Sequence, residues 1–212
     1  MNIRHSLTAL ALAASALSAH AAIVNIDLSA AVSGTYIDGV GADFTQRFAG
    51  QTVVGTGLVG APTNPLALDT DGMIEVAFWN PGVSDASNSL LSQPDNAAPL
   101  AILLDADADS FAWTMGSSVA GSSVVYSLYS ATGALVGGGY IGMGDGYNNY
   151  SLAGLPVFRG IAFYDNDDPS GVRFQNMSYN AVAVPEPSTY ALMALGLAVG
   201  AAAVRRQRRT GA

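Results

Sequence analysis

Between residues 22 and 183, hydrophobic positions fall in short runs separated by Gly, Pro, Asn and Asp. No window in this region keeps the apolar period of 3.6 residues that a surface helix requires. The runs that favour β-strands are residues 23–28, 73–79, 100–104, 111–115, 124–129, 134–136, 140–141, 157–164 and 172–179. This pattern predicts a single all-β domain in residues 22–183, built as a β-sandwich or a jelly roll.

The segments between these runs are predicted as turns and loops. Residues 84–99 are polar and contain proline, and residues 142–150 follow a run of glycines, so both are predicted as loops. Residues 49–65 are rich in Gly and small side chains and give no clear prediction. The run from Val172 to Tyr179 alternates well but changes face near Asn176 and Met177, which predicts a β-bulge.

The N-terminal 21 residues have the three parts of a secretory signal peptide. Arg4 precedes an apolar run at residues 6–17, and Ala19-His20-Ala21 supplies small residues at the positions before a cleavage site. The apolar run is short for a membrane span, so a retained anchor is the weaker alternative. We expect cleavage between Ala21 and Ala22.

The C-terminal end, residues 184–212, carries a second export-related pattern. Pro185-Glu186-Pro187 is followed by an uncharged apolar segment at 190–204 and then by Arg205, Arg206, Arg208 and Arg209. A helix over those fifteen residues would be about 22 Å long, so flanking residues are needed to span a hydrocarbon core of about 30 Å. The pattern predicts a transmembrane helix at about 188–206, with the arginines cytoplasmic and the β domain outside.

Pro-Glu-Pro, an apolar helix and a terminal arginine cluster, in this order, resemble the PEP-CTERM sorting signal. The resemblance is confined to residues 184–209. It implies recognition by an exosortase, passage through the inner membrane, and release at the surface of a bacterium that makes exopolysaccharide. The alternative is a plain membrane anchor that is never processed.

Charge and residue types narrow the chemistry of residues 22–183. Three arginines against fifteen carboxylates give this region a net charge of −12, so it repels nucleic acid and repels anionic polysaccharide unless a cation bridges the two. It has no His, Cys or Lys, which excludes Ser-His-Asp and Cys-His nucleophiles, Schiff-base chemistry, and zinc sites with N or S ligands.

Two acidic segments are candidate sites for a hard cation, with Ca²⁺ as the candidate cofactor, because Ca²⁺ binds six to eight oxygen ligands. The alternative in each case is an ordinary solvated turn or strand connection. The candidate residues are Asp165, Asn166, Asp167 and Asp168 in one segment, and Asp105, Asp107 and Asp109 in the other.

Other side chains suggest sugar chemistry. Asp69 and Asp71, with Glu75 behind them, could form the carboxylate pair of a glycoside hydrolase, although chance pairing is common in so acidic a domain. Tyr147 and Tyr150 are candidates for stacking on a sugar, whereas Trp79 and Trp113 lie in apolar runs and are predicted to be buried.

Three functions remain open. The favoured one is a non-enzymatic cell-surface or extracellular-matrix protein, sorted by exosortase and associated with exopolysaccharide. The second is a carbohydrate-binding module with Ca²⁺-assisted glycan binding, and the third is a carboxylate-based glycoside hydrolase. We expect the chain to be exported, anchored by its C-terminal helix before processing, and then located at the cell surface or in the matrix.

Overall fold

The computed structural model describes residues 22–78, 88–93, 98–117, 121–164, 167, 172–182, and 196, 197, 199 and 200. The chain divides into two units, residues 22–182 and a second unit of residues 1–21 and 183–212. The predicted signal peptide, the residues at 185–187 and the terminal arginines lie outside the described residues. Of the predicted transmembrane helix at 188–206, the four described residues are helical. Within the described part of the chain, no helix has the length and apolar character needed to cross a membrane.

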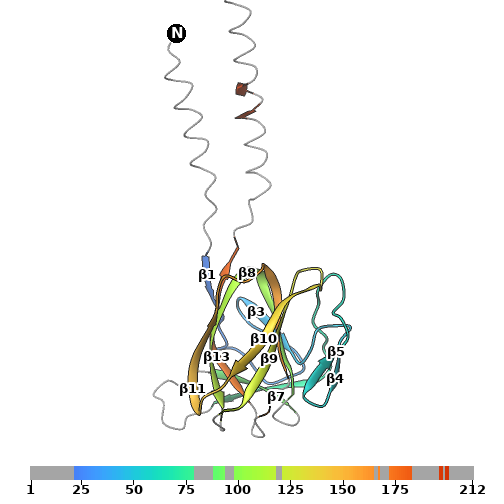
Figure 1. Cartoon of the computed structure of the whole chain (residues 1–212), viewed down its shortest axis with the longest axis vertical. Helices are drawn as coiled ribbons and strands as arrows, with labels where there is room; N and C mark the ends of the chain where they lie inside the picture. Colours follow the sequence, from blue (N-terminus) through green and yellow to red (C-terminus); the bar gives the residue numbers. More distant parts are fainter. Residues whose placement is uncertain are drawn as a thin grey trace, which may run out of the picture. The chain divides into compact units, whose positions relative to one another are not determined.

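Residues 22–182, called the β domain below, contain thirteen strands and no helix in their described part, which confirms the predicted all-β class (Figure 1). The strands are β1 (Ala22–Asn25), β2 (Ile37–Asp38), β3 (Ala42–Thr45), β4 (Thr52–Val54), β5 (Gly57–Val59), β6 (Met73–Phe78), β7 (Asn88–Gln93), β8 (Leu100–Ser117), β9 (Ser123–Tyr129), β10 (Leu135–Gly142), β11 (Gly146–Leu152), β12 (Phe158–Tyr164) and β13 (Arg173–Ala181).

Three segments differ from the sequence prediction. The runs at 100–104 and 111–115 belong to one strand, β8, because the intervening residues 105–110 are extended as well. Strand β7 lies inside the predicted loop 84–99, and β11 occupies much of the predicted loop 142–150. Both strands are rich in Asn and Ser, so their strand conformation comes from pairing with neighbours and not from intrinsic propensity.

Strand β8 organises the domain because it takes part in two sheets. Its first half lies between β12 and β3, which gives the first sheet the order β10-β9-β12-β8-β3-β2. Its second half lies between β11 and β13, and β13 also pairs with β1 and β7. The second sheet therefore consists of β11, β8, β13, β1, β7 and β6.

The inner faces of the two sheets pack against each other, as in a β-sandwich. Phe163 of the first sheet lies 4.8 Å from Phe174 and 5.3 Å from Trp113 of the second sheet, measured between ring centroids. All three side chains are at most 4% exposed, and they belong to one large hydrophobic cluster that contains residues of both sheets. The prediction that Trp113 is buried is confirmed, whereas Trp79 lies outside the described residues.

A second, smaller core covers the outer face of the first sheet. Phe48 and Leu66 pack there against Ala101, Tyr129 and Ala162. The Gln51 side chain anchors the same segment, since its Nε2 donates to the Tyr129 hydroxyl (3.0 Å) and its Oε1 accepts from the Phe48 backbone amide (3.2 Å). The region around residues 49–65, which the sequence left open, therefore covers the first sheet and includes the hairpin β4–β5.

Candidate functional site

The outer face of the second sheet carries a continuous set of uncharged polar side chains. In this sheet Phe111, Trp113 and Met115 of β8 point into the core, so the alternate residues of β8 and their partners point outward. We call this surface the polar face; its members are Thr114, Tyr147, Asn149, Ser151, Gln175, Asn176 and Ser178. The pairing register places Asn149 and Gln175 on either side of Thr114, and Ser151 and Ser178 on either side of Ala112.

The side chain of Tyr147, on β11, lies across the neighbouring strand β8. It pairs with Gly116, and a Cβ atom at Gly116 would lie only 2.7–2.9 Å from three atoms of the Tyr147 ring. The ring therefore rests on the backbone of β8, in space that only glycine leaves open. Arg173 of β13 pairs with Gly116 from the opposite side. Tyr147, Gly116 and Arg173 are therefore adjacent to one another across the three strands β11, β8 and β13.

Hydrogen bonds fix the amides of the polar face. The Thr114 hydroxyl donates to the side-chain Oδ1 of Asn149 at 2.7 Å and accepts from the side-chain Nδ2 of Asn176 at 3.4 Å. Asn176 has φ of 51° and lies where the register of β13 shifts between Gln175 and Ser178. The predicted bulge in β13 is therefore confirmed, and it turns the Asn176 side chain onto the polar face.

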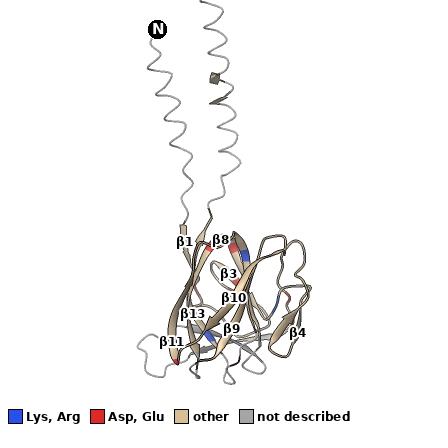
Figure 2. Cartoon of the chain, viewed as in Figure 1, with Lys and Arg blue, Asp and Glu red and all other residues tan. Residues whose placement is uncertain are grey.

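The polar face contrasts with the charge of the domain as a whole. Residues 110–144, 146–158 and 174–182 contain no charged side chain, and these ranges supply every member of the polar face. Figure 2 shows β9, β10 and β11, which lie in these ranges, largely in tan, the colour of uncharged residues. Asn149, Ser151 and Asn176 are exposed, whereas Thr114 is only 8% exposed and the Tyr147 hydroxyl is buried. The exposed amides and hydroxyl can exchange hydrogen bonds with a neutral polyhydroxylated ligand.

The structure separates the two tyrosines that the sequence grouped together. Tyr150 lies three residues after Tyr147 on β11 and faces inward, where its ring stacks on Trp113 at 5.8 Å. The sequence did not predict Thr114, Asn149, Gln175 or Asn176 as site residues, because they come from three strands that are distant in sequence. One local pattern pointed to this face: the residues between Phe111, Trp113 and Met115 are small or polar, which indicates the solvent side of the strand.

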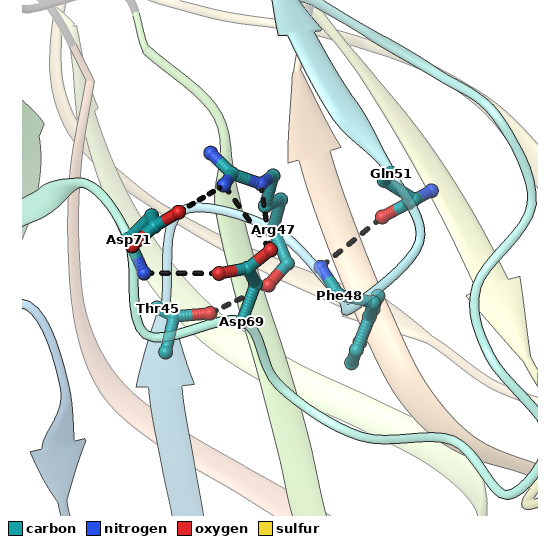
Figure 3. Close-up of polar contacts among 6 residues, drawn as sticks. All are labelled: Thr45, Arg47, Phe48, Gln51, Asp69 and Asp71. Carbon is teal, nitrogen blue, oxygen red and sulfur yellow. Dashed lines mark hydrogen bonds and ion pairs between the residues drawn. The ribbon is translucent and has the colours of Figure 1, made fainter.

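The acidic residues at 69 and 71 take part in a structural contact with Arg47 (Figure 3). The Arg47 guanidinium lies 3.1 Å from the Asp69 carboxylate and 3.2 Å from the Asp71 carboxylate. The Asp69 amide donates to the Arg47 carbonyl oxygen (3.1 Å), which also accepts from the Thr45 hydroxyl (2.7 Å). One arginine compensates both carboxylates, so this pair ties two loop segments together and does not resemble an acid and base flanking a substrate.

The carboxylates of Asp107, Asp109 and Asp167, three of the described residues of the predicted cation sites, each contact a partner within the protein. Asp107 lies 3.7 Å from Arg159, and Asp109 accepts from the side-chain Nδ2 of Asn180 at 3.0 Å. Asp167 accepts from the Ser123 amide and hydroxyl. Asp105 is exposed on β8, whereas Asp165, Asn166 and Asp168 lie outside the described residues. Among the residues that are described, no three carboxylate or imidazole side chains are grouped to hold a metal, and the Ca²⁺ site stays a prediction.

Asp105 instead joins an acidic group that the sequence did not indicate. Asp43 of β3 is paired with Asp38 of β2. Burial, followed by the charges of Asp38 and Asp105, raises the pKa of Asp43, although a hydrogen bond from Tyr36 acts in the opposite direction. Burial and the same carboxylates raise the pKa of Tyr36 to about 12. Three carboxylates thus share one region of the domain and destabilise one another when all are charged.

Comparison with known proteins identifies the C-terminal segment. Residues 183–209 match the family model described as the PEP-CTERM protein-sorting motif. This confirms the resemblance inferred from residues 184–209. The motif implies an exported precursor that is held in the membrane and processed by an exosortase.

No curated protein matches the chain. Among solved structures, one similar chain is a family 29 carbohydrate-binding module with 13% sequence identity and a TM-score of 0.39, covering 76% of this chain and 92% of that one. A second structure of a family 29 module has 12% identity and a TM-score of 0.40, with coverages of 76% and 89%. The enzymatically active domain of tailspike protein 4 from bacteriophage CBA120 has 16% identity and a TM-score of 0.36, with coverages of 51% and 18%. At these TM-scores the similarities carry no conclusion about ligands.

Proposed function

We propose that this chain is a non-catalytic glycan-binding protein of the bacterial surface, exported and sorted through its C-terminal motif. In this proposal the β domain binds a polysaccharide on the polar face of the second sheet. The observation that carries the proposal is the arrangement of Tyr147 on Gly116, beside a hydrogen-bonded group of Thr114, Asn149 and Asn176.

The chemistry of the polar face suits a sugar. Aromatic rings offer an apolar surface for the C–H face of a pyranose, and amides and hydroxyls both donate to and accept from sugar hydroxyls. Strands lie about 5 Å apart and rise about 3.3 Å per residue, so the polar face extends roughly 13 Å along β11 from residue 147 to residue 151. That length accommodates a short stretch of a glycan chain.

Binding without catalysis agrees with the residue types of the domain. It lacks His, Cys and Lys, and the carboxylate pair of Asp69 and Asp71 is engaged by Arg47. The polar face has no carboxylate among its members, so no group there can serve as the acid of a glycoside hydrolase.

Sorting and binding occupy separate parts of the chain. The last backbone hydrogen bond of the domain in the described residues runs from the Val182 amide to the Asp107 carbonyl oxygen, 2.7 Å, and the matched motif starts at residue 183. Strand β1 starts at Ala22 and pairs with Ala181 at the end of β13. Removal of residues 1–21 and of residues 183–212 would therefore leave the described strands of the β domain intact.

The test is a glycan array screened with residues 22–182, followed by titration of the best soluble oligosaccharide. We expect Tyr147→Ala to lower the affinity by at least about tenfold, or 1.4 kcal/mol, while Tyr147→Phe retains most of it. Tyr140→Ala is the matched control, because Tyr140 is 81% exposed on the first sheet. Titration in the presence of a chelator tests the Ca²⁺ prediction. Equal affinities of Tyr147→Ala and wild type would exclude the polar face as the binding site.

A further inference from the structure

Strand β10 is an open edge of the first sheet. In the described part of the structure it pairs only with β9. It has the sequence Leu-Val-Gly-Gly-Gly-Tyr-Ile-Gly, without charge or proline, and Tyr140 is 81% exposed. Natural edge strands are usually blocked by charges, prolines or bulges. The bulge between Leu135 and Gly137 interrupts only one end, so no described strand pairs with the outer edge of the regular segment Gly137–Gly142.

The domain uses one cross-strand pair repeatedly, a tyrosine ring lying on a glycine of the neighbouring strand. Tyr147 covers Gly116 in the second sheet. Tyr126 of β9 pairs with Gly139 of β10, and a Cβ atom at Gly139 would lie 3.0–3.2 Å from three atoms of the Tyr126 side chain. Such aromatic–glycine pairs stabilise sheet positions that a glycine would otherwise weaken. On the free edge of β10, Tyr140 and Gly138 point to the same outer side and lack this pairing within the described sheet.

We propose that β10 pairs antiparallel with β10 of a second copy of this chain, about a twofold axis at Gly139. In this register Tyr140 of each copy lies opposite Gly138 of the other. Two further tyrosine–glycine cross-strand pairs, of the kind seen twice within the domain, therefore form between the copies. Gly137 then lies opposite Ile141. The short segment from Gly137 to Ile141 is thus self-complementary, which is the condition for a closed twofold interface.

Charge favours a second copy at this edge over other sites of contact between copies. Two domains of net charge −12 repel each other, but residues 110–144, which include β9 and β10, contain no charged side chain. Pairing through β10 therefore brings no like charges directly together. The contact is small, so it depends on the high local concentration that anchoring in one membrane provides. This inference does not depend on glycan binding, because the polar face lies on the other sheet.

The test uses the full-length chain in membranes of an exporting host, and the absence of cysteine gives a clean background. In the proposed register, two copies of residue 140 are diagonal neighbours about 7–8 Å apart, so Tyr140→Cys should be joined by a short bis-maleimide. Leu135→Cys is the matched control, because Leu135 is 65% exposed on the same strand but its two copies would lie about 26 Å apart.

We expect at least about tenfold more cross-linked dimer from Tyr140→Cys than from Leu135→Cys. No dimer from Tyr140→Cys, or equal amounts from both variants, would overturn the proposal. As a second measurement, resonance energy transfer between two labelled populations of the full-length chain in the same membranes should be lost with Tyr140→Lys and retained with Leu135→Lys, because the membrane keeps the local concentration high. An equal effect of the two lysines would likewise contradict pairing through this edge, whether or not any glycan binds.

Discussion

Replacement of Phe163 by alanine tests whether the two sheets form one packed core. Phe163 is 2% exposed and lies between the sheets, 4.8–6.4 Å from the rings of Phe174, Trp113 and Phe111. A buried Phe→Ala replacement typically costs about 3–5 kcal/mol. Each lost aromatic pair adds about 0.5–1.5 kcal/mol beyond the area term, so we expect the upper end of that range. The free energy of unfolding of a domain of this kind is roughly 5–15 kcal/mol. The variant should therefore still fold, but with a clearly lower melting temperature.

The assay is urea unfolding of residues 22–182, followed by the fluorescence of the two tryptophans. We expect a large decrease of the midpoint with an unchanged slope, because the slope reports the surface exposed on unfolding. Leu135→Ala is the control: Leu135 is 65% exposed, and its truncation should change stability by less than about 0.5 kcal/mol. A loss below about 1 kcal/mol for Phe163→Ala would refute the two-layer packing.

Three further predictions concern single contacts. Asn176 has φ of 51°, so Asn176→Ala should cost about 1–2 kcal/mol in denaturant unfolding, while Asn176→Gly should cost clearly less; equal losses would refute the role of the bulge. The pKa of Asp43 is raised from 3.8 in the folded state, so its charge opposes folding above that pH. Asp43→Asn should therefore stabilise the domain at pH 7, and thermal melts should show the gain disappearing below pH 3.8. The side chain of Asp71 is 80% exposed and that of Asp69 is 25% exposed. Asp71→Asn should therefore lower the free energy of unfolding by less than about 0.5 kcal/mol, and Asp69→Asn by about 1–2 kcal/mol. A larger loss for Asp71→Asn than for Asp69→Asn would contradict the Arg47 contact.

Strong local patterns in the sequence predicted much of the fold. Runs of β-branched and aromatic residues identified β9, β12 and β13, and the change of face at Asn176 identified the bulge, because alternation in a strand is a local property. The sorting motif was equally readable, since its three parts are contiguous. The polar strands β7 and β11 were missed, because tertiary pairing alone makes their Asn- and Ser-rich sequences extended.

The candidate site was predicted only in part, for a related reason. Tyr147 was identified from its sequence neighbourhood, but its companions Thr114 and Asn176 reach it through the register of β8 and β13. Tyr147 and Tyr150 were grouped because they are close in sequence, yet residues three apart on a strand face opposite sides. Asp69 and Asp71 suggested chemistry because the sequence does not show that Arg47 lies between them.

The most direct test of the proposed function is hydrogen exchange on residues 22–182, with and without the glycan that binds best. We expect slower exchange to be concentrated in β11 and β13, where the exposed amides and Tyr147 would contact the sugar. The edge strand β10 and the segment over the first sheet at residues 46–68 should keep their exchange rates. Protection of β10 or of residues 46–68 with none in β11 and β13 would contradict glycan binding on the polar face.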